Sequence, residues 1–126
     1  MAKQQFELEY HFNTSAKVLF PRLSTADGLN EWFADRVKVD GQNYIFHWDK
    51  EEREAVLKTI KPLKTVRFHW TDDDEDDTYF EFNLSVTELT DDLALTIIDY
   101  AEPDEIDEMT EIWNAQISDL KRILGA

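Results

Sequence analysis

The chain has 126 residues, the length of one globular domain, and its content of 42% hydrophobic and 33% charged residues is too apolar for a disordered protein. It contains no cysteine, which excludes disulfides, thiol nucleophiles and cysteine-ligated zinc. The formal net charge of −15 argues against binding to nucleic acid or to an anionic membrane.

The N-terminal segment shows no pattern of export or membrane insertion. The first ten residues hold no apolar run of signal-peptide length, and no stretch of about 18 apolar residues occurs in the chain. Glycine and proline are scarce, with three of each, and no linker or internal repeat is visible. We therefore expect one domain over residues 1–126, in a cytoplasmic protein without membrane insertion.

The first quarter of the chain predicts a strand followed by two short helices. Residues 5–12 alternate between apolar and polar side chains, as in a half-buried strand. Residues 13–15 supply N-caps for a helix over 16–23, which Pro21 is expected to kink or shorten. Residues 24–33 begin with a Ser-x-x-Asp pattern that resembles a capping box, which predicts a second helix capped by its first residue.

The middle of the chain predicts an antiparallel sheet. From residue 35 to residue 100 the apolar period is mostly two, which indicates about six successive strands. Turn signals divide this region at residues 40–41, 49–51, 61–64 and 90–92, and an acidic run interrupts it at residues 72–77. Hairpin connections of this kind make neighbouring strands antiparallel.

The end of the chain predicts one long helix of about 20 residues. Pro103 suits its first turn, acidic residues follow near the positive end of the helix dipole, and Gly125 is a stop signal. One apolar stripe runs along the helix at steps of three and four residues: Ile106, Met109, Trp113, Ile117, Leu120 and Leu124. Such a stripe packs on one face of a sheet, so the fold class is α+β.

Three segments resemble a known family. Residues 15–20 (SAKVLF) and 29–35 (LNEWFAD) look like the two-helix opening of homologues of the activator of heat-shock-chaperone ATPase. Residues 112–124 (IWNAQISDLKRIL) look like the final helix of the same family. Over nearly the whole chain, the order of elements resembles the helix-grip fold of the wider START-like (SRPBCC, birch-pollen-allergen-like) superfamily.

The resemblance implies a curved antiparallel sheet of six or seven strands wrapped around the C-terminal helix, often with a cavity between them. Members bind lipids, hormones, polyketides or other apolar molecules; some are cyclases, and others bind a chaperone through protein contacts. Many related sequences carry a glycine-rich turn between mid-sheet strands. The corresponding segment here is the acidic run at residues 72–77.

Aromatic residues are numerous, with 8 Phe, 4 Trp and 4 Tyr. Those on the inward phase of the strands and helix could line an apolar pocket, with Tyr hydroxyls and Trp N–H groups orienting the polar end of a ligand. The same pattern also suits a packed core without a pocket, because any core needs apolar side chains at these periods. The expected lining residues are Tyr10, Phe46, Trp48, Phe68, Phe82, Trp113 and Ile117.

Histidines and the acidic run are weaker candidates for sites. His11, His47 and His69 are each out of phase with their apolar neighbours, so we expect them at the solvent face and predict no metal site. The carboxylates of residues 72–77 could attract a hard cation or a basic partner, but the run lacks the glycine and spaced glutamate of an EF-hand. A mobile, solvated hairpin loop is the favoured interpretation.

Two further groups of charged residues were candidates for chemistry on sequence grounds. A basic segment lies at residues 58–67, but a nucleic-acid site is unconvincing on a chain of this net charge. Asp99 and Glu102, near the end of the last strand, are the best candidates for a carboxylate pair, which would need a cleft and a raised pKa. No hydrolase, P-loop or dinucleotide motif occurs, so we predict no catalytic residue and no cofactor.

These patterns support one leading hypothesis of function and two alternatives. The leading hypothesis is a domain that binds a small apolar or amphipathic ligand between the sheet and the C-terminal helix. The alternatives are a protein-interaction module or chaperone ATPase regulator without a small-molecule ligand, and, third, a cyclase-type enzyme. A homodimer is also expected if Trp32 and Phe33 form an exposed apolar patch near the pocket mouth.

Overall fold

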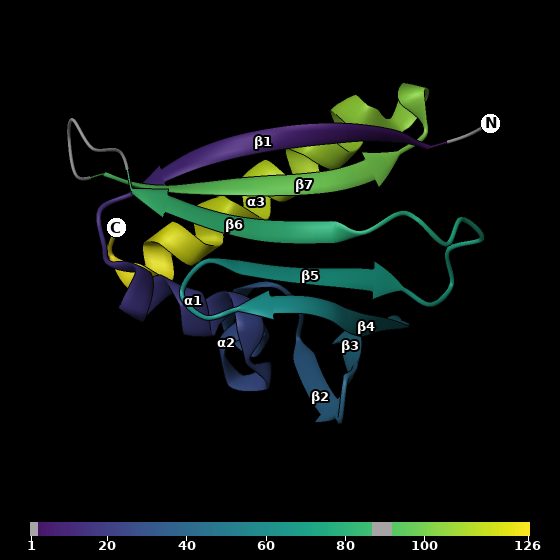
Figure 1. Cartoon of the computed structure of the whole chain (residues 1–126), viewed down its shortest axis with the longest axis horizontal. Coiled ribbons are helices and arrows are strands. Elements are labelled where there is room, and N and C mark those ends of the chain that lie inside the picture. The colour runs from purple at the N-terminus through teal and green to yellow at the C-terminus, as the bar shows by residue number, and fades with distance from the viewer. Residues whose placement is uncertain (1–2, 87–91) are drawn as a thin grey trace.

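The computed structural model describes residues 3–86 and 92–126, and these form one antiparallel sheet with helices on one face (Figure 1). Its strands follow the order β1-β7-β6-β5-β4-β3-β2 across the sheet. Their bounds are β1 Gln4–Phe12, β2 Arg36–Asp40, β3 Asn43–Trp48, β4 Glu51–Lys61, β5 Thr65–Trp70, β6 Phe80–Val86 and β7 Leu93–Ala101. The first strand therefore joins the last one, and the remaining strands pair in chain order.

Two short helices and one long helix complete the fold. The short helices are α1 (Ala16–Ser24) and α2 (Ala26–Trp32), and a 3₁₀ turn (Pro103–Glu105) leads into α3 (Ile106–Leu124). Figure 1 shows α3 running diagonally behind the sheet toward α1 and α2. This is the helix-grip α+β architecture predicted from the sequence. None of the helices in residues 3–86 and 92–126 is long and apolar enough to cross a membrane.

The predicted strands all form, and β1, β3, β5 and β7 show the alternation of more and less buried side chains that a sheet with one buried face requires. In β4 the alternation is irregular, and its pairing with β5 shifts register between Leu57 and Thr59. The long helix ends where expected, at Gly125, whose φ of 67° is the left-handed conformation that glycine adopts readily. The turn predicted at residues 90–92 falls largely outside the described residues.

The start of the second helix differs from the prediction. Its N-cap is Thr25, whose Oγ1 accepts a hydrogen bond from the Gly28 N–H at 3.0 Å. The Ser24 hydroxyl donates instead to the Phe20 carbonyl within α1. The Ser-x-x-Asp pattern therefore indicated the right boundary but the wrong cap, because Ser24 still belongs to the first helix.

Pro21 lies inside α1 without ending it, since the helix continues to Ser24. The chain then turns sharply, and α2 crosses so close to α1 that a Cβ atom on Gly28 would lie 2.0 Å from the Pro21 carbonyl oxygen. Only a residue without a side chain fits this contact. The packing of α2 on α1 therefore requires glycine at position 28.

The space between the sheet and α3 is filled largely by aromatic rings. Phe33 lies at the centre of this cluster, with its ring centroid 5.1 Å from that of Phe46 and 5.8 Å from those of Phe80 and Trp113. Edge-to-face and offset-stacked pairs at these separations stabilise a core beyond the area they bury. The packed-core interpretation of the aromatic pattern therefore describes the centre of the fold.

Candidate functional site

The candidate site lies at the end of the sheet where α3 begins. Because the sheet is antiparallel, the starts of β1, β4 and β6 and the ends of β5 and β7 meet at this edge. In Figure 1 it is the right-hand end, where β7 leads into the first turn of α3. The aromatic cluster stops short of this end, and two adjoining pockets remain.

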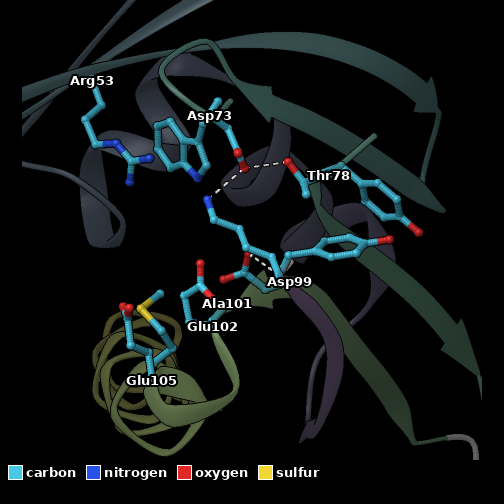
Figure 2. Close-up of a pocket in the computed structure, with 12 residues that line it drawn as sticks. Arg53, Asp73, Thr78, Asp99, Ala101, Glu102 and Glu105 are labelled. Carbon is cyan, nitrogen blue, oxygen red and sulfur yellow. Dashed lines mark hydrogen bonds and ion pairs between the residues drawn. The ribbon is translucent and has the colours of Figure 1, made fainter. Parts of the chain in front are cut away.

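The first pocket, here called the polar pocket, has a volume of about 200 Å³. Figure 2 shows its charged side chains on two sides: Arg53 and Asp73 on one, and Asp99, Glu102 and Glu105 on the side formed by β7 and the start of α3. The other lining residues are Lys3, Trp70, Thr78, Tyr79, Tyr100, Ala101 and Met109.

The second pocket, here called the apolar pocket, has a volume of about 280 Å³ and lies between the β3–β4 hairpin and α3. Its walls are mainly aromatic and aliphatic: Phe33, Trp48, Trp70, Met109, Ile112 and Trp113, with Glu51, Arg53, Asp99 and Gln116 at its polar positions. Arg53, Trp70, Asp99 and Met109 line both pockets. The two hollows therefore adjoin, and together they offer an apolar wall beside a charged one.

Asp99 lies at the boundary between the pockets and is 7% exposed. It continues the inward alternation of β7 after Leu95 and Ile97, so the strand itself directs this carboxylate into the interior. One carboxylate oxygen accepts a hydrogen bond from the Trp113 Nε1–H at 2.9 Å, and the other accepts one from the Tyr100 backbone N–H at 2.8 Å.

Burial raises the pKa of Asp99 to about 6, because a carboxylate loses hydration there. The N–H groups of Trp113 and Tyr100 oppose this rise, since they stabilise the ionised form. A buried carboxyl with a raised pKa in a pocket is a common feature of functional sites. The arrangement can accept hydrogen bonds from a ligand, and near neutral pH it presents a negative charge.

The cationic side chains of the polar pocket are already paired. Lys3 Nζ lies 3.0 Å from Asp73 Oδ2, and the Arg53 guanidinium donates two hydrogen bonds of 2.9 Å to Asp72. Arg53 also lies over the Trp70 ring, with 3.9 Å between Cζ and the ring centroid. The hydrogen bonds from Arg53 lower the pKa of Asp72. Burial acts to raise the pKa of Asp73, but hydrogen bonds from the Thr78 hydroxyl, the Glu75 backbone N–H and Lys3 outweigh it and lower that pKa.

Part of the acidic run has defined partners. Asp73 is held by Lys3, by the Thr78 hydroxyl and by the Glu75 backbone N–H, so it forms part of the pocket wall. Asp72, Asp74, Asp76 and Asp77 are exposed, as expected for a solvated loop. No group of three or more His, Asp or Glu side chains suited to a metal occurs in residues 3–86 and 92–126.

The histidines and the basic segment have local partners. His11 pairs with Glu9, His47 lies 3.2 Å from Glu52, and His69 Nδ1 lies 2.7 Å from the Thr78 carbonyl oxygen. In the basic segment, Arg67 pairs with Glu81 at 2.6 Å. None of the three histidines lines the polar or the apolar pocket, and neither does Arg67.

The structure separates the seven predicted lining residues into two groups. Trp48 and Trp113 line the apolar pocket. The others lie away from both pockets: Phe46, Phe68, Phe82 and Ile117 in the packed core, and Tyr10 on β1, where its hydroxyl donates to Asn114. The apolar pocket thus lies at one end of the space between the sheet and α3, and not along its centre.

Trp32 and Phe33 do not form the exposed patch expected from the sequence. They are only 7% and 4% exposed, because α2 turns both rings into the core. The Trp32 Nε1–H donates to the Arg22 carbonyl, which ties α2 to α1. The prediction of a dimer contact through an exposed pair of these rings is therefore wrong.

Several site residues were missed by sequence reasoning. Lys3, Arg53 and Met109 come from three distant elements, and nothing in their local sequence indicates that they converge. Asp99 did carry a signal, because it is a carboxylate on the inward phase of an apolar strand. Glu102 follows three residues later, and the structure brings the two residues of the suggested carboxylate pair to one pocket.

Comparison with protein families settles the classification of this fold. The model of the START-like superfamily domain matches residues 1–126. The chain belongs to the START-like superfamily. No curated protein matches this START-like domain significantly.

Solved structures of other START-like proteins resemble this domain over almost its whole length. The solution structure of BfR322 from Bacteroides fragilis is 39% identical, with a TM-score of 0.69 and coverage of 98% of this chain and 93% of that one. The solution structure of the Aha1 dimer from Colwellia psychrerythraea is 17% identical, with a TM-score of 0.79 and coverage of 94% and 93%. CalU16 from Micromonospora echinospora is 14% identical, with a TM-score of 0.76 and coverage of 97% and 74%. The last two likenesses show the fold alone.

Proposed function

We propose that this START-like domain binds a small amphipathic molecule in the polar and apolar pockets at the start of α3. The observation that carries the proposal is the junction of the two pockets at Arg53, Trp70, Asp99 and Met109. Ligand sites in proteins are typically hollows with mostly apolar walls and a few well-placed polar groups. Here the apolar wall provides contact area for the ligand, and the buried carboxylate of Asp99 orients the polar end of the ligand.

The size of the hollow limits the ligand. The two pockets measure about 200 and 280 Å³, and they share part of their walls. The aromatic cluster around Phe33 closes the space toward the other end of the sheet. The proposal therefore specifies a ligand of one or two rings, or a short chain, and excludes a long acyl chain that runs the whole length between the sheet and α3.

The direct test is native mass spectrometry of the protein purified without detergent, followed by organic extraction of any bound species. Met109→Trp, which places a larger ring where both pockets meet, should abolish binding. Ile123→Trp is the matched control, because it adds the same ring to the same helix at a position that lines neither the polar nor the apolar pocket. Ile123 borders a third hollow, between α2 and α3, which shares Phe33, Trp48 and Gln116 with the apolar pocket. Thermal unfolding of both variants checks that each remains folded.

The outcomes separate the hypotheses of function. A bound species of defined mass in the wild type and in Ile123→Trp, but not in Met109→Trp, supports the proposal. A clean apo mass, together with no ligand response in a small-molecule screen, contradicts it and favours a protein-interaction module. The same spectrum measures whether the domain forms a homodimer, as the related Colwellia psychrerythraea protein does.

A further inference from the structure

Only some of the charged side chains of the polar pocket form ion pairs. On one side, the cations of Lys3 and Arg53 are paired with Asp73 and Asp72. On the other side are Asp99 and two glutamates at the start of α3 (Figure 2). Within residues 3–86 and 92–126, no ion pair includes any of these three carboxylates. The pocket thus has an excess of negative charge on one wall.

Two of these carboxylates have unused capacity to accept hydrogen bonds. Asp99 receives one N–H from Trp113 and one from its neighbour Tyr100, although a carboxylate has about four lone-pair positions. The Oε2 atom of Glu102 is buried and receives no hydrogen bond from any described residue. Buried acceptors are normally satisfied, so an unsatisfied one beside a pocket indicates a donor that the chain does not supply.

The surroundings also favour a positive charge. A net charge of −15 creates a negative potential that a low-dielectric cleft concentrates, which attracts cations. Trp48, Trp70 and Trp113 line the adjoining apolar pocket, and aromatic rings attract cations as well as apolar groups; Trp70 already carries the Arg53 guanidinium over its ring. A hydrogen bond between an ammonium group and a carboxylate is stronger than one between neutral groups.

We propose that the pocket selects ligands whose polar end is a protonated amine, held by Asp99 and Glu102, and whose apolar body rests on the tryptophans of the apolar pocket. This inference rests on the proposed function, because it specifies the chemistry of that ligand. Burial raises the pKa of Asp99 to about 6, so the carboxylate is ionised at pH 7.5 and can pair with the amine.

The test compares three probes that share one ring system and differ in charge: 1-naphthylmethylamine, 1-naphthalenemethanol and 1-naphthoate. Binding is followed at pH 7.5 by ¹H–¹⁵N NMR. The Trp113 indole resonance is a direct reporter, because its N–H bonds to Asp99. We expect the amine to bind at least about tenfold more tightly than the alcohol, and the carboxylate to bind most weakly.

Two variants identify the groups responsible. Asp99→Asn and Glu102→Gln keep the shape of each side chain but remove its charge, so each should reduce the advantage of the amine over the alcohol at least about threefold. The affinity for the alcohol should change little. Asp104→Asn is the control, because this carboxylate is exposed at the same end of α3 and lines neither pocket.

Each outcome has a definite meaning. If the alcohol binds as tightly as the amine in the wild type, the preference for cations is refuted while the proposed binding function stands. If Asp104→Asn weakens amine binding as much as the two pocket variants do, general surface charge and not the pocket is responsible, and the assignment falls. If none of the probes moves pocket resonances, both proposals fail for ligands of this size.

Discussion

The buried carboxylate of Asp99 should make the stability of the domain depend on pH in an unusual direction. Most carboxylates in folded proteins are stabilised in the ionised form, so stability rises as the pH increases from their folded-state pKa to their higher unfolded-state pKa. Asp99 is the opposite case, because its pKa is about 6 in the folded state and 3.8 for the free side chain. Between these values the folded state binds a proton that the unfolded state has released, so rising pH removes stability.

The size of the effect follows from the two pKa values. Their separation corresponds to about 3 kcal/mol of unfolding free energy, present below pH 3.8 and fully lost well above pH 6. The sequence pI is 4.4, so measurement near that pH risks precipitation. Between pH 5.0 and 7.5 the same two pKa values still predict a loss of about 1 kcal/mol from this group.

Urea unfolding of the wild type and Asp99→Asn at these two pH values isolates this contribution. An asparagine resembles the protonated carboxyl in shape, but it loses one acceptor for the N–H groups of Trp113 and Tyr100. That cost does not change with pH, so it cancels when the difference in unfolding free energy between variant and wild type is compared at the two pH values. We expect this difference to shift by about 1 kcal/mol in favour of the variant from pH 5.0 to 7.5.

Asp104→Asn is the control for this experiment, and its difference from the wild type should stay within about 0.5 kcal/mol, as for other surface substitutions. If Asp99→Asn gives the same offset at both pH values, the carboxyl titrates near its ordinary value and the argument from burial is refuted. A shift of the opposite sign would mean that the hydrogen bonds to the ionised form outweigh the loss of hydration.

Three further predictions concern single contacts. Trp113→Phe keeps an aromatic side chain but removes the N–H donor to Asp99, so the pKa of that carboxyl should rise further, as measured by ¹³C NMR titration. Gly28→Ala should destabilise the domain by at least about 2 kcal/mol in urea unfolding, because its Cβ would meet the Pro21 carbonyl at 2.0 Å; an unchanged midpoint would contradict this contact. Thr25→Ala should cost about 1 kcal/mol through loss of the α2 cap, and a value near zero would argue against that cap.

Local patterns accounted for most of the secondary structure. The two-residue alternation of the strands and the apolar stripe of α3 arise from burial of one face, which the neighbouring residues themselves encode. The cap of α2 was assigned one residue too early, since Ser24 and Thr25 are both good caps and only the packing of α1 against α2 decides between them. The exact residue at which a helix begins depends on such tertiary contacts, whereas local periodicity is enough to predict that the helix exists.

The position of the pocket depended on the tertiary structure. From the sequence, inward aromatic residues such as Phe46 and Phe82 could equally line a cavity or fill a core, because both require the same periodicity. The fold decided this by placing Phe33, which follows α2, among them; its ring fills the centre, and the polar and apolar pockets lie toward the start of α3. Lys3, Arg53 and Glu102 meet there because antiparallel pairing brings distant chain segments to one edge.

The sequence by itself therefore determined the family, the order of the elements and the inward direction of Asp99, because each of these follows from local periodicity or from matching segments. Which charges are paired followed from the tertiary structure. Lys3 and Arg53 form ion pairs with the acidic run, whereas Asp99 and Glu102 form no ion pair with any described residue, although all four line one pocket; Arg53 and Lys3 still favour the ionised form of Asp99 at longer range. The distinction arises because electrostatic pairing depends on distances of a few ångströms between residues far apart in the chain.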